Sequence, residues 1–512
     1  MVDEAAGGRS VDVVLGVDIG TSSTKAVFSD LQGRVIADSF RAHVVDRPAQ
    51  GRVEMDSAVW WTELCSLVAE LTAAAPECTI VAVGVSGMGP CVLLSDAEGH
   101  PLRPAILYGV DARSVGMADE VLEVLGGEAA MRARTGSGLS AQAAGLKLAW
   151  LARHEPHIWS RAVRFTMPSS RIVELLTGEY VLDHHSASQC TPLYDVVHEA
   201  WIDEWAALLA PGLTLPRLGW PGDTAGHITA DAAAATGLPV GVPVAFGSID
   251  AWVESLSAGR RQPGRVFLQY GTTMFMVAPM TEPTPIDGMW TTAGARPGEP
   301  TAAGGMATSG AVTDWVRQLT GADYAELLNE AVVSGPGARG LLVLPYFAGE
   351  RSPIADPDAR GVIAGLSIGH TRGDIYRAVL EATAFAVRHH LEVLASHGVS
   401  ADTLVGAGGG VATELWPQIV SDVCGIDQVI PTVSIGAAYG SAVLAAALVT
   451  KVDIDDWNPP AVRLQPDPAN AALYDEAYAD YRRLYYETRD TVHRLAGRSR
   501  DSSKVRPSGS TD

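Results

Sequence analysis

The sequence lacks most of the features that mark a secreted or disulfide-stapled protein. Cysteine is scarce: there are five, an odd number, widely spaced and without a CxxC pair. This favours a reducing compartment over a disulfide framework or a zinc site. The N-terminal segment, MVDEAAGGRS, carries acids and glycines where a secretory signal needs a basic start and an apolar stretch. A cytoplasmic location is therefore expected.

Positive charge and long apolar runs are also in short supply. The 37 Lys and Arg residues face 59 Asp and Glu residues, which gives a formal net charge of -22. This charge repels phosphate backbones and anionic lipids, so neither nucleic acid nor membrane is an expected partner. An anionic small molecule would need backbone amides, helix N-termini and a divalent cation. The apolar stretch 437–449 is too short to span a bilayer and predicts a buried helix.

What the chain does contain is enough apolar sequence for at least two domains with separate cores. Its hydrophobic fraction is 47%, and 512 residues exceed one typical domain several-fold. Apolar runs at 11–18 and 24–28, separated by a Gly-Thr-Ser-Ser turn, predict a β-hairpin. A third strand at 34–40 completes a meander, and the alternating run 79–86 predicts a further strand of the same sheet.

The same hairpin design recurs in the second half of the chain. Strand-like runs at 265–270 and 274–278 flank a second turn, Gly271-Thr272-Thr273. Only the first copy offers a carboxylate, because Gln269 stands where Asp18 stands in the first hairpin. A polar, glycine-rich segment at 259–264 separates the copies and predicts the domain boundary and a hinge.

The remainder of the second half is predicted to be largely helical. Thr371 and Asp374 form a capping box before a long helix, and glycines at 406–410 lead into another helix near 415–423. The last segment, 498–512, is rich in serine and charge and predicts a disordered tail.

Three short segments could carry chemistry, and each has a plainer alternative. Asp18, followed by Gly20, Thr21 and Ser22, could hold magnesium while amides and hydroxyls bind phosphate, although such a motif alone is more often an ordinary hairpin turn. Asp250 follows an apolar run and precedes a predicted helix. The helix dipole there favours an ionised carboxylate that can accept a proton, and the alternative is simple N-capping.

The third segment is the glycine run 408–410, which could let a nucleotide approach the backbone or could be a flexible turn before a helix. Two adjacent histidine pairs, at 184–185 and 389–390, are rejected as metal ligands. Neighbouring residues point in different directions, and neither pair has a nearby Cys or acidic cluster at ligand spacing.

Taken in order, these segments resemble the FGGY family of carbohydrate kinases. The resemblance rests on GVDIGTSSTKAVFSD, LYGVDARS, LLTGEY, LPYFAGERSPIADPDARGVIAGL, RAVLEATAFAVR and GAGGGVATELWPQIVSDVCG. It implies an α/β protein with two ribonuclease-H-like domains of the actin-like ATPase superfamily around a central cleft. The implied parts are an N-terminal sugar-binding domain at 11–258, a C-terminal nucleotide-binding domain at 265–450 and a helical extension at 451–497.

The resemblance also implies roles for individual residues. Asp250 would be the catalytic base and would contact the sugar, and Asp18 would lie near Mg²⁺. The residues implied to bind phosphate or ATP are Thr21, Ser22, Gly271, Thr272, Gly310, Asp314, Gly409 and Thr413. Those implied to contact the sugar, besides Asp250, are Met88, Gly89, Asp111 and Arg113.

One departure bears on the substrate. Xylulokinases usually place Met-His within a GQMHG segment, whereas this chain has Met88-Gly89-Pro90 and so lacks the histidine donor. A lost hydrogen bond to a sugar hydroxyl changes which ketose fits. The segment also lacks the Arg-Glu pair of glycerol kinases.

The expected activity is therefore ATP-dependent phosphorylation of a small ketose or polyol, with D-xylulose or a related pentulose as the leading candidate. Kinship also implies a homodimer. The alternative from a different class is a non-kinase ATPase of the same superfamily, or a sugar-responsive regulator that binds without turnover.

Overall fold

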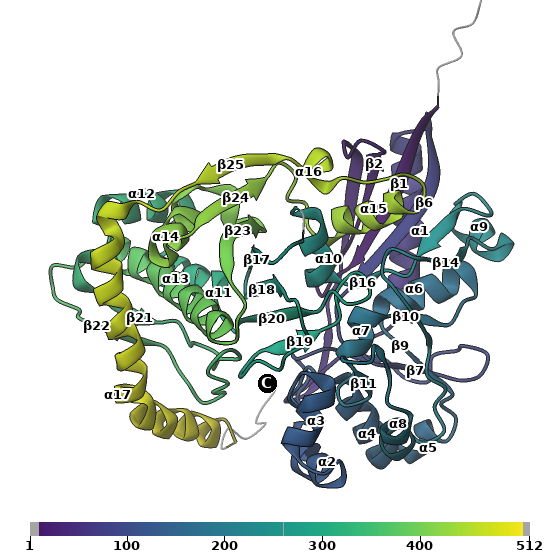
Figure 1. Ribbon diagram of the computed structural model, residues 1–512, viewed down its shortest axis with the longest axis horizontal. Helices are drawn as coiled ribbons and strands as arrows, with labels where there is room; N and C mark the ends of the chain where they lie inside the picture. The colour runs from purple at the N-terminus through teal and green to yellow at the C-terminus, as the bar shows by residue number, and fades with distance from the viewer. Residues whose placement is uncertain (1–9, 260, 505–512) are drawn as a thin grey trace, which may run out of the picture.

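A computed structural model describes residues 10–259 and 261–504 and divides the chain into two lobes (Figure 1). Each lobe is built on its own β-sheet. The first lobe carries the N-terminal strands, and the second carries most of the chain after residue 264 (Figure 1). Among the described residues, no helix combines the length and the apolar content that crossing a bilayer would require.

The first sheet contains the predicted meander. β1 (Val11–Ile19) pairs antiparallel with β2 (Ser23–Asp30), which pairs with β3 (Val35–Ala42). On its other side β1 pairs parallel with β6 (Cys78–Gly87), which confirms the predicted fourth strand. β1 is buried from Val13 onward, because helices cover both faces of the sheet. Beyond β6 lie β14 (Thr224–His227), β15 (Pro243–Ala245) and β16 (Ser248–Ile249).

The second sheet repeats this arrangement. β17 (Gly264–Tyr270) pairs antiparallel with β18 (Met274–Pro279) and parallel with β23 (Ala401–Ala407), as β1 does with β2 and β6. The predicted duplication of the hairpin is therefore confirmed. The remaining strands of this sheet are β19 (Trp290–Thr292), β20 (Thr301–Met306), β24 (Asp427–Pro431) and β25 (Pro460–Leu464).

Two helices lie between the sheets and join the lobes. α10 (Asp250–Ser257) packs on α15 (Ala437–Ala447), and α15 packs on β1 and β6 of the first sheet although in sequence it lies between β24 and β25 of the second sheet. The helix lies so close to the sheet that a Cβ atom at Gly84 would come within 2.0 Å of the Ser441 carbonyl oxygen. Glycine is required there because backbone meets backbone. α15 is buried along most of its length, as predicted.

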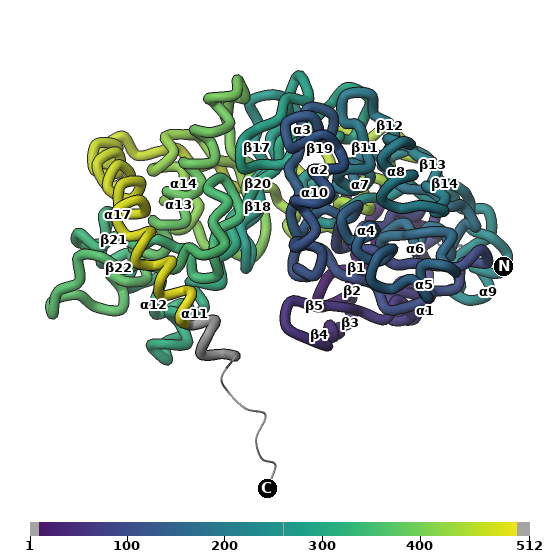
Figure 2. The backbone as a smooth tube through the Cα atoms, turned by 90° about the horizontal axis from the view of Figure 1, so that it is seen from below, coloured from purple at the N-terminus to yellow at the C-terminus, as the bar shows by residue number. Residues whose placement is uncertain are grey.

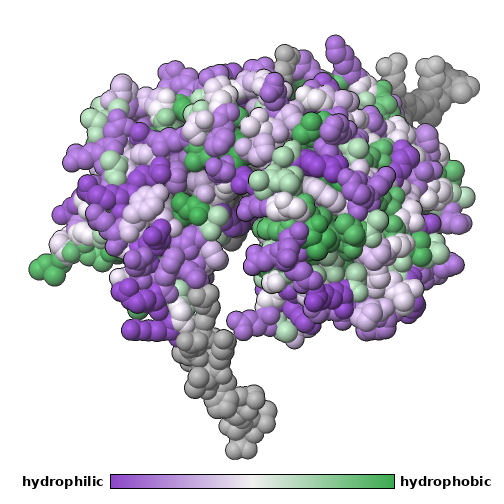
Figure 3. All heavy atoms as spheres, turned by 60° about the horizontal axis from the view of Figure 1, so that its bottom comes forward, coloured by the Kyte–Doolittle hydropathy of each residue, from purple (hydrophilic) through white to green (hydrophobic). Residues whose placement is uncertain are grey.

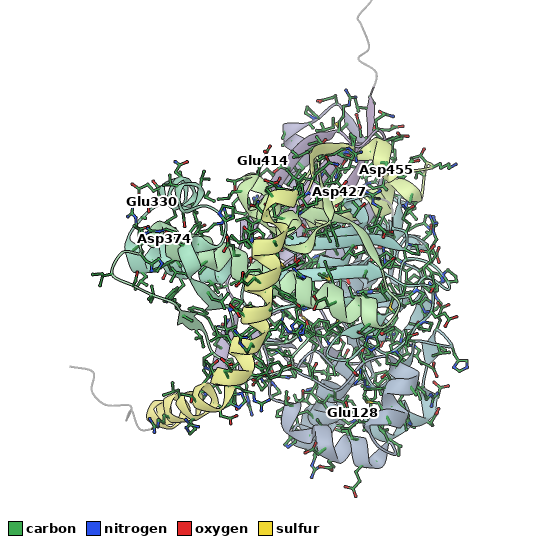
Figure 4. All side chains as sticks on the ribbon, turned by 60° about the vertical axis from the view of Figure 1, so that its left-hand side comes forward. Glu128, Glu330, Asp374, Glu414, Asp427 and Asp455 are labelled. Carbon is green, nitrogen blue, oxygen red and sulfur yellow. The ribbon has the colours of Figure 1, made fainter. Side chains whose placement is uncertain are left out.

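Two helices of the second lobe confirm sequence predictions. α13 (Arg372–Ser396) begins with the predicted capping box between Thr371 and Asp374, and α14 (Leu415–Cys424) follows the glycine run. In Figure 4, Asp374 marks the start of α13 at the edge of this lobe. α17 (Ala471–Lys504) lies along the outside of the lobe (Figure 2). Residues 498–504 are thus helical and not a disordered tail, and 505–512 lie outside the described residues.

The remaining helices and strands pack around the two sheets. In the first lobe they are β4 (Asp46–Ala49), β5 (Arg52–Met55), α1 (Ala58–Ala74), β7 (Leu93–Ser95), β8 (Ala105–Ile106), α2 (Ala118–Val124), α3 (Glu128–Thr135), α4 (Ala144–His154), α5 (Pro156–Trp159), β9 (Arg164–Thr166), α6 (Pro168–Thr177), β10 (Val181–Asp183), α7 (His184–Ser188), β11 (Tyr194–Asp195), β12 (Ala200–Trp201), α8 (Asp203–Leu209), β13 (Arg217–Gly219) and α9 (Ala230–Thr236). In the second lobe and its extension they are α11 (Gly310–Thr320), α12 (Tyr324–Ser334), β21 (Leu342–Leu344), β22 (Val362–Ala364) and α16 (Ile454–Trp457).

Candidate active site

A cavity of about 290 Å³ lies where the two lobes meet, and residues of both lobes line it. The surface is hollowed between the lobes (Figure 3). The side chains that the first lobe contributes include Asp18, Lys25, Tyr108, Gln142, Gln189, Asp250 and Glu254. Those from the second lobe include Gln269, Thr273, Phe275, Trp290, Thr292 and Arg351.

Asp250 lines this cavity as the first residue of α10, directly after β16. The residue in the N-cap position is Ile249, and the Asp250 carboxylate accepts a hydrogen bond from the neighbouring Ala251 N–H, at 2.7 Å. Asp250 therefore does not cap the helix in the usual way, and its side chain is not part of a hydrophobic core.

Asp18 reaches the same cavity from the end of β1. Its carboxylate accepts a hydrogen bond of 3.0 Å from the Ser86 hydroxyl on the adjacent strand β6. Burial raises the pKa of Asp18, and burial together with the negative charge of Asp18 raises the pKa of Asp250. The hydrogen bond from the Ala251 N–H at the start of α10 opposes this rise in the pKa of Asp250, but burial has the larger effect.

A third carboxylate lies one helical turn beyond Asp250. Burial raises the pKa of Glu254 to about 7, and Glu254 accepts a hydrogen bond from the Gln269 side chain of the second lobe. Carboxylates that share a buried cavity repel one another unless a cation or a proton lies among them. The carboxylate oxygens of this cavity are the donor type that Mg²⁺ prefers, so the residues present fit that ion.

The first predicted phosphate-binding turn, which follows β1, contacts a tyrosine that lines the cavity. Thr21 and Ser22 do not themselves line the cavity, but the Thr21 hydroxyl lies 3.0 Å from the hydroxyl of Tyr108, which does. The turn also has a close backbone contact, because the Gly20 N–H donates to the Ser23 carbonyl oxygen at 3.0 Å.

A second, larger cavity of about 720 Å³ lies against the second sheet. The Gly310 N–H, at the start of α11, donates to the Gly271 carbonyl oxygen at 2.9 Å, so this helix begins at the second hairpin turn. Apolar and aromatic side chains such as Tyr376 and Trp416 form much of the wall, as in many ligand pockets. Six residues predicted from the sequence line it: Gly271, Thr272, Gly310, Asp314, Gly409 and Thr413.

The predicted sugar-side residues separate into two groups. Gly89 lines the cavity between the lobes, whereas Met88 is buried beneath it. Asp111 and Arg113 do not line the cavity. They form a buried ion pair of 2.7 Å, and Asp111 also accepts the Val53 N–H at 2.7 Å. The structure therefore places this pair behind the wall, where it holds the loop that carries Tyr108.

Several cavity residues escaped the sequence interpretation. Tyr108 and Lys25 stand inside motifs that were noticed for other residues, and Arg351 stands inside the GERSP block. Gln142 and Gln189 lie in short connections with no local pattern, so no sequence signal identifies them. Only the fold brings them to the cavity.

In the described ranges, neither histidine pair belongs to a group of three potential metal ligands. His184 lies 2.8 Å from the Tyr194 hydroxyl and His185 lies 2.9 Å from the Ala293 carbonyl oxygen, so both rings have internal partners. The one group of three potential ligands found in the described ranges is Asp96, Glu98 and His100, of which Glu98 and His100 are exposed.

Comparison with known proteins gives a consistent result along nearly the whole chain. The family model for the N-terminal domain of the FGGY family of carbohydrate kinases matches residues 13–256, and the model for its C-terminal domain matches residues 266–449. A xylulose kinase of Streptomyces rubiginosus is 32% identical over 504 residues, which cover 96% of this chain and 97% of the relative. A glycerol kinase of Nocardia farcinica is 32% identical over 464 residues, which cover 85% and 90%.

Among solved structures, the xylulose kinase from Rhodospirillum rubrum has a TM-score of 0.85 at 32% identity and covers 94% of this chain and 100% of its own. These matches confirm the expected carbohydrate kinase and give no support to a non-kinase ATPase or regulator. The chain belongs to the FGGY family of carbohydrate kinases, enzymes that phosphorylate sugars on a two-domain actin-like fold.

Proposed function

We propose that this kinase transfers the γ-phosphoryl group of ATP to a hydroxyl of a small ketose or polyol, with D-xylulose or a related pentulose as the first candidate. The observation that carries the proposal is the meeting of Asp18 and Asp250 in one cavity between two duplicated hairpins. The larger cavity beside the second hairpin is of a size and lining that suit adenosine. Relatives named xylulose kinase favour a pentulose, and the glycerol kinase relative keeps polyols among the candidates.

In this proposal Asp250 accepts the proton of the attacking hydroxyl. The sugar oxygen forms a bond to the γ-phosphorus while the bond to the β–γ bridging oxygen breaks, and ADP leaves. Asp18 would hold Mg²⁺, which supplies charge neutralisation at the phosphates when it is bound. Gly271, Thr272 and the first turn, with Thr21 and Ser22, would bind phosphate oxygens through backbone amides and hydroxyls.

The sugar would lie on the first-lobe side of the cavity. Asp250 and the side chains of Tyr108, Gln142 and Gln189 offer donors and acceptors for several hydroxyls. At Gly89, where a histidine donor would stand, the Ile249 side chain fills the space, because a Cβ atom there would lie 2.5 Å from Ile249. We therefore expect discrimination among pentuloses to depend on the two glutamines more than on the segment that contains Gly89.

The decisive variant is Asp250→Asn. Loss of the base should lower kcat by about 10²- to 10⁴-fold, while nucleotide binding is retained. Asp231→Asn is the matched control, because Asp231 is an exposed aspartate in the first turn of another helix of the same lobe. Full activity of Asp250→Asn, measured as ADP release with saturating sugar, would refute the assignment.

The substrate is identified by ADP release across a panel of ketoses and polyols, followed by identification of the phosphorylated product. A kinase of this kind should release ADP much faster with its sugar than without it. If no ketose or polyol stimulates ADP release, the proposed substrate class is wrong. The expected homodimer stays a prediction that sedimentation can check.

A further inference from the structure

The segment 344–366 contains the most distinctive sequence of the chain, and the proposed function has so far given it no role. It follows β21 in the second lobe and carries Glu350 and Arg351. Arg351 lines the cavity that contains Asp18 and Asp250, so this segment places a positively charged side chain among the carboxylates of the cavity.

The Arg351 guanidinium is fixed beside the second phosphate turn. Its Nη2 donates a hydrogen bond of 2.7 Å to the carbonyl oxygen of Met306. Met306 ends β20 and pairs with Met274, the residue that follows the turn Gly271-Thr272-Thr273. The guanidinium is therefore anchored to the strand that adjoins this turn.

The backbone of the segment is anchored at the same place. One carboxylate oxygen of Glu350 accepts the backbone N–H groups of Arg351, at 2.8 Å, and of Ala307, at 2.7 Å. Because Ala307 directly follows β20, Glu350 fixes the base of the Arg351 side chain to the end of that strand. The position of the guanidinium is thus held by contacts at both ends of the side chain.

From this anchor Arg351 faces the first lobe. Burial raises the pKa of Tyr108, and the positive charge of Arg351 opposes that rise across the cleft. The Tyr108 hydroxyl in turn lies 3.0 Å from the Thr21 hydroxyl of the first phosphate turn. Arg351 is thus a cation of the second lobe that lines the same cavity as Tyr108, which contacts the first phosphate turn.

The guanidinium also has hydrogen-bonding capacity to spare. Its Nε is buried and has no hydrogen-bond partner, and no carboxylate of the described residues forms an ion pair with Arg351. Burial lowers the pKa of Arg351 because its charge is poorly solvated. The negative charge of the neighbouring Glu350 opposes this change, but Glu350 forms no ion pair with Arg351. A desolvated cation without an ion-pair partner gains most from an anion that binds later.

Building on the proposed function, we propose that Arg351 is a catalytic residue that donates hydrogen bonds to the phosphoryl group during its transfer. As the sugar oxygen bonds to phosphorus and the bridging bond to ADP breaks, negative charge spreads over the equatorial oxygens, and a planar guanidinium matches two of them. The proton of the sugar hydroxyl still goes to Asp250. Arg351 and Asp250 come from different lobes but line the same cavity, so groups from both lobes can act on one phosphoryl group.

The test compares Arg351→Ala and Arg351→Lys with Arg360→Ala. Arg360 belongs to the same segment, but its guanidinium donates only to the carbonyl oxygens of Pro357 and Ala359 and does not line the cavity. We expect Arg351→Ala to lower kcat by about 10³-fold with little change in the KM for sugar, and free guanidinium to restore part of the activity. Arg360→Ala should behave as the wild type.

A binding measurement separates this role from a purely structural one. Fluoroaluminate with Mg²⁺ and ADP mimics the phosphoryl group in transfer, so Arg351→Ala should lose affinity for that complex and keep its affinity for ADP alone. Equal affinity of the variant and the wild type for the fluoroaluminate complex, or a kcat within about 3-fold of the wild type, would overturn the proposal. If the wild type phosphorylates no sugar, the proposed function fails, but the fluoroaluminate comparison still tests Arg351.

Discussion

At the residue scale, the site contains three carboxylates, and the surroundings of each raise its pKa. Asp18, Asp250 and Glu254 all line one cavity, and burial is the largest cause of the raised pKa of each. A general base with a raised pKa is a stronger proton acceptor, provided that it is ionised at the working pH. In its proposed role as the base, Asp250 would thus accept a proton more readily but would work over a narrower pH range.

This predicts the pH dependence of the reaction. Only the ionised form of Asp250 can accept a proton, and its pKa is raised above the usual 3.8, so kcat/KM should fall as the pH drops through that higher value. Glu254→Gln removes a like charge that contributes to the rise, so the acid limb should move to lower pH. A profile of kcat/KM against pH measures both effects, and an acid limb that is unmoved in Glu254→Gln would contradict the coupling.

Site residues that belong to local sequence motifs could be predicted from the sequence. Those that reach the site only through tertiary contacts could not. Asp18, Asp250, Gly271, Thr272 and Gly409 lie within glycine-rich or strand-to-helix patterns that can be read locally, whereas the family resemblance alone indicated Gly310, Asp314 and Thr413. Gln142 and Gln189 have no such pattern, since only tertiary contacts bring their loops to the cavity. For Asp111 and Arg113 the reverse holds. They belong to a recognisable motif, but they form an ion pair with each other and do not line the cavity.

At the scale of secondary-structure elements, the duplicated hairpin could be predicted because both strand patterns and both turns are local features. The placement of α15 could not be predicted. Its small, apolar residues indicated a buried helix, but they did not show that it packs on β1 and β6 of the other lobe's sheet. That contact depends on glycines in both strands, which the sequence alone does not connect to α15.

The close approach of α15 to the sheet predicts that Gly84→Ala is strongly destabilising. The added Cβ would lie 2.0 Å from the Ser441 carbonyl oxygen, so the helix must shift, at a cost of about 1 to 3 kcal/mol or more. Gly116→Ala is the control, because a Cβ there meets nothing within 4 Å and should change stability by less than about 0.5 kcal/mol. Denaturant unfolding measures both, and equal stability of the two variants would rule out the tight contact.

At the scale of the whole molecule, the residues that line the central cavity are divided between the lobes. Asp18 and Asp250 belong to the first lobe, whereas Gln269, Trp290 and Arg351 reach the cavity from the second. The chain crosses between the lobes at 259–264, where Gly259 and Gly264 both have positive φ angles. The sequence predicted this connection as a hinge from its glycines, and the structure gives those glycines backbone conformations that other residues rarely adopt.

This division predicts that the enzyme closes when both substrates bind. Closure should bring Arg351 towards the phosphoryl group and exclude water, so ATP hydrolysis without sugar should be slow compared with transfer to the sugar. Small-angle scattering should show a smaller radius of gyration with sugar plus a non-hydrolysable ATP analogue than with either ligand alone.

Tryptophan fluorescence offers an independent reading of the same motion. Trp290 lines the cavity from the second lobe, so closure over the sugar should change its emission, and Trp290→Phe should abolish that change while the compaction seen by scattering persists. If the wild type keeps the same radius of gyration with both ligands and hydrolyses ATP as fast without sugar as with it, the lobes act as a preformed cleft. Arg351 and Asp250 would then have to meet the substrates without any movement of the hinge.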